Sequence, residues 1–316
     1  MKKIATMGEL LIDFVPMEKS GAFEQKFGGA PGNVAATIAI LGGDAVFYGA
    51  VGKDMFGDFL IKEIKRFGVD SSHIIQKNEA RTGITFVTND KEGNRSFLFF
   101  RNPSADMLYS ADDFESSHGD EDIFAFSSIS LIDYPIKDAH LAIIDYVRSR
   151  DGIIVFDANL RIHLWKDQDH YRDVVIDFIG KSDILKVAEE EVFWISRKND
   201  LESGLRYLKS LGPKMIVLTL GKEGSEIHIK KKAYFAPAFK VPTVDTTGAG
   251  DAFMGALLFK ISISEKSYLA FTDDEYQEML TFANAVAALS TTKKGAVEAV
   301  PSLKEALEFL KVNGSL

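Results

Sequence analysis

The sequence predicts an α/β fold built on a mainly parallel central sheet with helices on both faces. Short apolar runs alternate with helical patterns along most of the 316 residues, which is typical of this class. The composition agrees, because 46% hydrophobic and 26% charged residues are ordinary for a globular protein. Ligands of such folds bind at the carboxyl ends of the strands, so candidate site residues are sought there.

The elements follow in order from apolar patterns and glycine stops. A buried strand at 3–8 ends at Gly8, and the next segments are a helix at 32–42, a strand at 45–52 and an amphipathic helix at 54–68. The later half repeats the alternation, with strands expected at 152–157, 183–188 and 215–221 and a helix at 138–150.

Two regions break this alternation. Residues 82–88 and 95–101 are apolar runs around a polar turn, which predicts a β-hairpin, and the segment 13–27 is extended in character. They form either edge strands of the main sheet or a separate β lid (13–29 and 82–104) over a pocket. In the second interpretation the main domain comprises 1–12, 30–81 and 105–316. Exposed aromatic residues of the hairpin would then favour a homodimer through the lid: Phe97, Phe99 and Phe100.

Charge and composition exclude several classes of function. The formal net charge of −9 disfavours nucleic acid or an anionic membrane as a partner, and no apolar run is long enough to span a bilayer. The absence of cysteine excludes disulfides, thiolate metal sites and cysteine nucleophiles. Acidic residues interrupt the N-terminal segment too early for a signal peptide, so a cytoplasmic location is expected.

The stretch DTTGAGD at 245–251 carries the chemistry. Residues 240–244 are expected to form a strand, and helical spacing of apolar residues follows Asp251, so Gly248 to Gly250 lie at a helix N-terminus. Unpaired backbone N–H groups and the helix dipole make such a glycine turn an anion-binding hole. Asp251 is then either a general base beside that hole or a plain N-cap residue. The chain contains neither a Walker A motif nor a dinucleotide-binding glycine motif after its first strand.

Seven strings in the same order give the chain a clear resemblance to the PfkB, or ribokinase-like, sugar kinases, and within them to the fructokinases. They are GELLID (8–13), FGGAPGNVA (27–35), FRNPSADM (100–107), SISLI (128–132), FDANLRIHLW (156–165), TLGKEG (219–224) and DTTGAGD (245–251). The resemblance implies a three-layer α/β/α ribokinase-like fold with a small β lid, and phosphorylation of a sugar by ATP. The expected reaction is transfer to the C6 hydroxyl of D-fructose.

The resemblance also implies roles for individual residues. Asp251 is the general base, Gly248, Ala249 and Gly250 supply the anion-hole amides, and Arg161 contacts the transferring phosphoryl group. The sugar pocket is expected to contain Asp13, Gly28, Gly29, Asn33, Arg101 and Asn159. The nucleotide side is expected to contain Lys186, Glu191, Thr219, Gly221, Gly224, Asn284 and Gly295. Taken alone, each of these residues also has an ordinary structural interpretation, such as a turn glycine or a solvated charge.

Metal binding is implied with one departure from the family pattern. Glu191 matches the glutamate that organises Mg²⁺ through water, but Ala188 stands where an asparagine is expected. Asp245 and Thr247 lie where many relatives bind K⁺. Two alternative functions stay open: a 2-keto-3-deoxygluconate kinase, whose substrate carboxylate calls for extra cationic side chains, and a catalytically silent sugar-binding regulatory protein.

Overall fold

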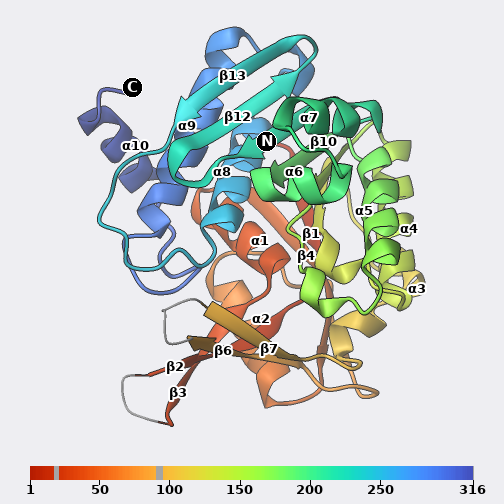
Figure 1. Cartoon of the computed structure of the whole chain (residues 1–316). Helices are drawn as coiled ribbons and strands as arrows, with labels where there is room; N and C mark the ends of the chain where they lie inside the picture. Colours follow the sequence, from red (N-terminus) through yellow and green to blue (C-terminus); the bar gives the residue numbers. More distant parts are fainter. Residues whose placement is uncertain (18–20, 90–94, 316) are drawn as a thin grey trace.

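The computed structural model describes residues 1–17, 21–89 and 95–315, with side chains for all of these except 89 and 95–97. A nine-stranded sheet in the order β13-β12-β11-β10-β9-β8-β1-β4-β5 forms the central layer, and it is parallel except at β12 and β13 (Figure 1). Its strands are β1 (Lys3–Met7), β4 (Asp44–Gly52), β5 (Ile74–Lys77), β8 (Ile123–Ser127), β9 (Ile153–Asp157), β10 (Ile184–Ala188), β11 (Met215–Thr219), β12 (Gly224–Ile229) and β13 (Lys232–Pro237).

Helices cover both faces of this sheet. Side chains along each parallel strand point alternately to the two faces, so both faces are apolar and each packs into a separate core. In β8, for example, Ile123 and Ala125 join one core, while Phe124 and Phe126 join the other. The first core includes residues of α1 (Ala30–Ile40), α2 (Met55–Arg66), α8 (Ala249–Ile263), α9 (Asp273–Ser290) and α10 (Leu303–Val312). The second includes residues of α3 (Ala111–Glu115), α4 (Pro135–Ser149), α5 (Gln168–Gly180), α6 (Glu189–Ser196) and α7 (Leu201–Ser210). The predicted three-layer fold is confirmed.

A second sheet of four strands projects from the carboxyl end of β1 (Figure 1). Its order is β3-β2-β6-β7, and its strands are β2 (Leu11–Pro16), β3 (Phe23–Gly28), β6 (Gly83–Asn89) and β7 (Arg95–Phe100). The two extended regions therefore form a sheet of their own and are not edge strands of the main sheet. The hairpin turn at 90–94 and the side chain of Phe97 lie outside the described residues.

One predicted strand is wrong. Residues 240–244 run without strand pairing, although their composition suggested a strand before the glycine turn. Pro242 has no N–H to donate to a ladder, and the backbone N–H groups of Val244 and Asp245 donate to the carbonyl of Thr291 instead. The segment is thus held by the loop after α9. None of the helices in the described part of the chain combines the length and apolarity that crossing a bilayer requires.

Candidate active site

A cleft of about 600 Å³, counting the part open to solvent, lies where the carboxyl ends of the parallel strands meet the second sheet. Its lining comes from segments far apart in the sequence: β2, α1, β7, the loop after β9 and the start of α8. Eight residues of the predicted site line it: Asp13, Gly29, Asn33, Asn159, Arg161, Thr247, Gly248 and Asp251. Glu9, Phe99 and Ile129 line it as well and were not predicted as site residues.

Asp251 is a partly buried carboxylate in the first turn of α8. Gly248 is the N-cap of this helix with a positive φ of 76°, so the N-cap interpretation of Asp251 is wrong. The Asp251 side chain instead accepts a hydrogen bond of 2.8 Å from Nδ2 of Asn33 on α1. Burial raises the pKa of Asp251 to about 6, while the hydrogen bond from Asn33 acts in the opposite direction. A carboxylate with this pKa is largely ionised at neutral pH and is still basic enough to accept a proton.

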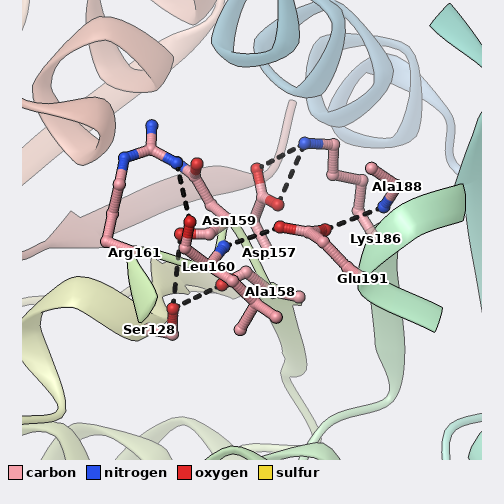
Figure 2. A network of polar contacts seen from close by, with 9 residues as sticks. All are labelled: Ser128, Asp157, Ala158, Asn159, Leu160, Arg161, Lys186, Ala188 and Glu191. Atoms are coloured by element: carbon pink, nitrogen blue, oxygen red, sulfur yellow. Dashed lines mark hydrogen bonds and ion pairs between the residues drawn. The ribbon is translucent and has the colours of Figure 1, made fainter. Parts of the chain in front are cut away.

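A buried ion pair lies next to Asp251. Nζ of Lys186 on β10 is 3.0 Å from both carboxylate oxygens of Asp157, which ends β9, and the two side chains are only 8% and 6% exposed (Figure 2). Burial lowers the pKa of Lys186, but the carboxylates of Asp157 and Glu191 outweigh it and keep the ammonium charged. The same ammonium lies 3.5 Å from the position that a Cβ on Gly250 would take. A fixed positive charge therefore stands beside the amides of the glycine turn.

Glu191 holds two loops of the site together. One of its carboxylate oxygens accepts from the backbone N–H of Ala188 at 2.8 Å and the other from that of Leu160 at 2.6 Å (Figure 2). The carboxylate thereby caps α6 and anchors the residue that precedes Arg161. Arg161 lines the cleft, and its guanidinium donates to the carbonyl of Leu160 at 3.0 Å. The preceding Asn159 has a positive φ of 34°, which turns the chain sharply after β9.

Two glycines allow the second sheet to approach α1. Gly29 has a φ of +112°, and a Cβ there would lie 2.2 Å from the carbonyl oxygen of Glu9. A Cβ on Gly28 would lie 2.4 Å from a carboxylate oxygen of Asp13. At Gly29 a side chain would collide with the backbone, so glycine is required there by space as well as by conformation. At Gly28 a side chain would instead displace the carboxylate of Asp13.

Arg101 lies beside the cleft and not in its lining. It forms an ion pair with Asp106 in which both side chains are almost fully buried, 6% and 0% exposed. Glu9, also buried, accepts from Oγ of Ser130 at 2.6 Å and from the backbone N–H of Ala30 at 3.2 Å. Burial raises the pKa of Glu9, and the nearby guanidinium of Arg101 opposes that rise. Arg101 thus belongs to a buried charge cluster beside the cleft, and its contact with the sugar stays a prediction.

Several residues predicted for the nucleotide side lie at the carboxyl end of β11 or in the loop after α9. Thr219 ends β11, and Gly221 and Gly224 follow it with positive φ values of 55° and 132°. The backbone N–H of Gly295 donates to Asp245 at 3.3 Å, which ties this loop to the glycine turn. Asp245 also accepts from the backbone N–H of Thr247 at 2.8 Å.

Asn284 has a structural role that the sequence did not suggest. Its amide donates to the carbonyl of Ala236 at 2.9 Å and accepts from Oγ of Ser225 at 2.9 Å. The side chain is 7% exposed and joins α9 to the β12–β13 hairpin. Both of its polar groups are therefore used within the fold, and its place on the nucleotide side stays a prediction.

Comparison with known proteins agrees with this geometry. Residues 1–303 match the pfkB family carbohydrate kinase. The chain belongs to the PfkB family of carbohydrate kinases. Fructokinase-2 of Zea mays is 37% identical over 97% of this kinase and 93% of its own length. The kinase is a phosphotransferase that acts on a sugar hydroxyl.

Solved fructokinases share the fold of this kinase throughout. The Xylella fastidiosa fructokinase with bound ATP has a TM-score of 0.93 at 31% identity and covers 99% of this kinase and 100% of its own chain. A double mutant of the Vibrio cholerae fructokinase, solved with fructose, ADP and a potassium ion, has a TM-score of 0.91 at 31% identity over 98% of both chains. The Vibrio cholerae fructokinase has also been solved with fructose, ADP and a calcium ion.

The charge cluster of Glu9, Arg101 and Asp106 is the part of the site that sequence reasoning missed. The sequence contained a signal for this cluster, because Glu9 lies in the string GELLID with Asp13, and Arg101 and Asp106 both lie in FRNPSADM. Only the folded chain shows that the two strings meet, since β2 pairs with β6 and β6 with β7.

Proposed function

We propose that this kinase is a fructokinase, which transfers the γ-phosphoryl group of ATP to the C6 hydroxyl of D-fructose. The observation that carries the proposal is the partly buried carboxylate of Asp251, which lies in the first turn of α8 and faces the same cleft as Asp13. The fructokinase relatives and the fructose-bound and ATP-bound structures support the choice of substrates.

In this mechanism Asp251 removes the proton of the sugar hydroxyl. The hydroxyl oxygen forms a new bond to the γ-phosphorus as the bond to the bridging oxygen breaks, and ADP leaves with the electron pair of that bond. The amides of Gly248, Ala249 and Gly250 stabilise the negative charge on the phosphoryl oxygens. The ammonium of Lys186 and the guanidinium of Arg161 add positive charge on either side of the transfer path.

The charges that line the cleft favour a neutral sugar over a keto acid. Three carboxylates line it, those of Glu9, Asp13 and Asp251, whereas Arg161 is the one cation in its described lining. Carboxylates accept hydrogen bonds from sugar hydroxyls but repel a carboxylate on the substrate. This argues against the 2-keto-3-deoxygluconate kinase. The retained base and glycine turn argue against a silent sugar-binding protein.

The donor atoms present fit a magnesium ion that is held through water and the phosphates of ATP. Both oxygens of Glu191 already accept backbone N–H groups, and among the described residues no three acidic or histidine side chains are grouped so that they could hold a metal ion. When bound, Mg²⁺ would neutralise phosphate charge, and Glu191 would orient its water ligands. We also propose that the loop of Asp245 and Thr247 holds a monovalent cation, as K⁺ is present in the Vibrio cholerae structure.

The second sheet is proposed to act as a lid and as a dimer interface. Asp13 and Phe99 of its inner face line the cleft, so movement of the sheet would exclude water from the reaction. Its outer face exposes apolar side chains, Phe23 by 42%, Leu98 by 58% and Phe100 by 54%. We propose that a second copy of the chain covers them. The cytoplasmic location stays a prediction.

The test is a panel of substrates with Mg-ATP, scored for ADP release. Fructose should give the highest kcat/KM, well above ribose, glucose and 2-keto-3-deoxygluconate. A higher kcat/KM for the keto acid would overturn the proposed substrate. No sugar-dependent ADP release with any member of the panel would favour the regulatory protein.

A further inference from the structure

We infer that Asn33 positions the catalytic base, and that this one side chain couples sugar recognition to the orientation of Asp251. The inference rests on the proposed role of Asp251. It goes beyond a contact between Asn33 and the sugar, because it assigns the two ends of the amide to two different partners.

The geometry separates the two ends of the amide. Nδ2 of Asn33 donates to Oδ2 of Asp251 at 2.8 Å. Oδ1 is buried and finds no hydrogen-bond partner among the described residues, although the side chain lines the cleft and is only 7% exposed. A buried acceptor without a partner is unfavourable unless a ligand satisfies it. A sugar hydroxyl next to the reacting one is a donor of the right chemistry.

The orientation of the amide is fixed by charge. An ionised carboxylate only accepts hydrogen bonds, so it selects the NH₂ end of Asn33 and leaves Oδ1 for the substrate. The other charged groups around Asp251 come from elements other than α1. They are Asp157 on β9, Lys186 on β10 and Arg161 in the loop after β9. From α1, the group that contacts the carboxylate is Asn33, so its effect can be removed separately.

The spacing of two helices sets the length of this hydrogen bond. One turn after Asn33 and Asp251 come Thr37 and Gly255, and a Cβ on Gly255 would lie 2.5 Å from Cβ of Thr37. Glycine at 255 therefore allows α1 and α8 to cross closely enough for Asn33 to reach the base. An alanine at 255 should push the helices apart and lengthen the contact.

The test compares pH profiles of kcat/KM, whose acidic limb reports the base in the free enzyme. Asn33→Leu keeps a similar volume but removes the donor. Its acidic limb should move up by about one pH unit, because the ionised carboxylate loses a hydrogen bond. The kcat should also fall by ~10–100-fold, since the base is no longer held in place. Gly255→Ala should shift the limb in the same direction by less.

Asp13→Asn is the matched control, because Asp13 lines the same cleft on β2. It should raise KM without moving the acidic limb upward, because removal of a nearby negative charge does not raise the pKa of Asp251. An unmoved limb in Asn33→Leu, with only KM raised, would show that Asn33 is a sugar ligand and nothing more, and would overturn the inference. If Asn33→Leu does not fold, Asn33→Ser, whose hydroxyl is too short to reach the base, takes its place.

A second readout needs no substrate. The carboxyl carbon of Asp251 can be titrated by ¹³C NMR and assigned by its absence in Asp251→Asn. A higher pKa in Asn33→Leu than in the unmodified protein supports the inference even if fructose is the wrong sugar. An unchanged pKa contradicts it whatever the substrate panel shows.

Discussion

Replacing Asp251 with asparagine should stabilise the fold while it removes the base. The pKa of Asp251 is about 6 in the folded protein against 3.8 for an unperturbed aspartate, and burial is the main cause. A raised pKa of an acid means that ionisation favours the unfolded state. The resulting loss of folding stability is absent below pH 3.8, grows between pH 3.8 and 6, and is constant above pH 6. At 1.36 kcal/mol per pKa unit, the full cost is about 3 kcal/mol.

Asparagine has nearly the same shape, carries no charge and can still accept a hydrogen bond from Asn33. The free energy of unfolding of Asp251→Asn should therefore exceed that of the unmodified protein by up to about 3 kcal/mol at pH 8. At pH 5 the difference should shrink to about half of that. Urea denaturation at both pH values measures it. A variant that is equally or less stable at pH 8, or a difference that grows toward acid, would refute the claim that this carboxylate is desolvated.

Three further predictions follow from the same site. Lys186→Met should destabilise the fold by about 3–5 kcal/mol, because Asp157 is left buried without its partner. The control Lys214→Met breaks an exposed ion pair with Asp183 and should destabilise the fold by less than about 1 kcal/mol. Equal losses of unfolding free energy in urea denaturation would contradict the burial argument. Gly29→Ala should destabilise the fold more than Gly42→Ala does. Both positions have positive φ, but only the Cβ at 29 would meet a backbone atom, at 2.2 Å. Thermal unfolding of the two variants tests this, and a lower melting temperature for Gly42→Ala would be inconsistent with the collision. In the unmodified enzyme kcat/KM should fall tenfold per pH unit below about pH 6 as Asp251 becomes protonated, and a rate that is flat down to pH 5 would exclude this carboxylate as the base.

The sequence predicts the fold well where local pattern and burial agree. The continuous apolar runs of β1, β9 and β11 mark buried parallel strands, and glycine stops mark the ends of α1 and α2. Residues 240–244 mislead because their valines suggest a strand, whereas strand pairing depends on a neighbour that the pattern does not reveal.

For the site, the sequence strings identify the residues that carry the chemistry but not the residues with which they form hydrogen bonds and ion pairs. Asp251 and the glycine turn stand out because a helix N-terminus is a local feature. The burial of Arg101 against Asp106 and the use of Asn284 within the hairpin depend on contacts between distant segments. The Asn33–Asp251 hydrogen bond is of the same kind, since it joins residues 218 positions apart. Such pairings become visible only once the helices are packed.

The most direct test of the account is the turnover number of Asp251→Asn with saturating fructose and Mg-ATP. The account predicts a fall of kcat by ~10²–10⁴-fold, with fructose and ATP still bound as judged by calorimetry. A kcat within about threefold of the unmodified enzyme would contradict the central claim that this carboxylate activates the sugar hydroxyl.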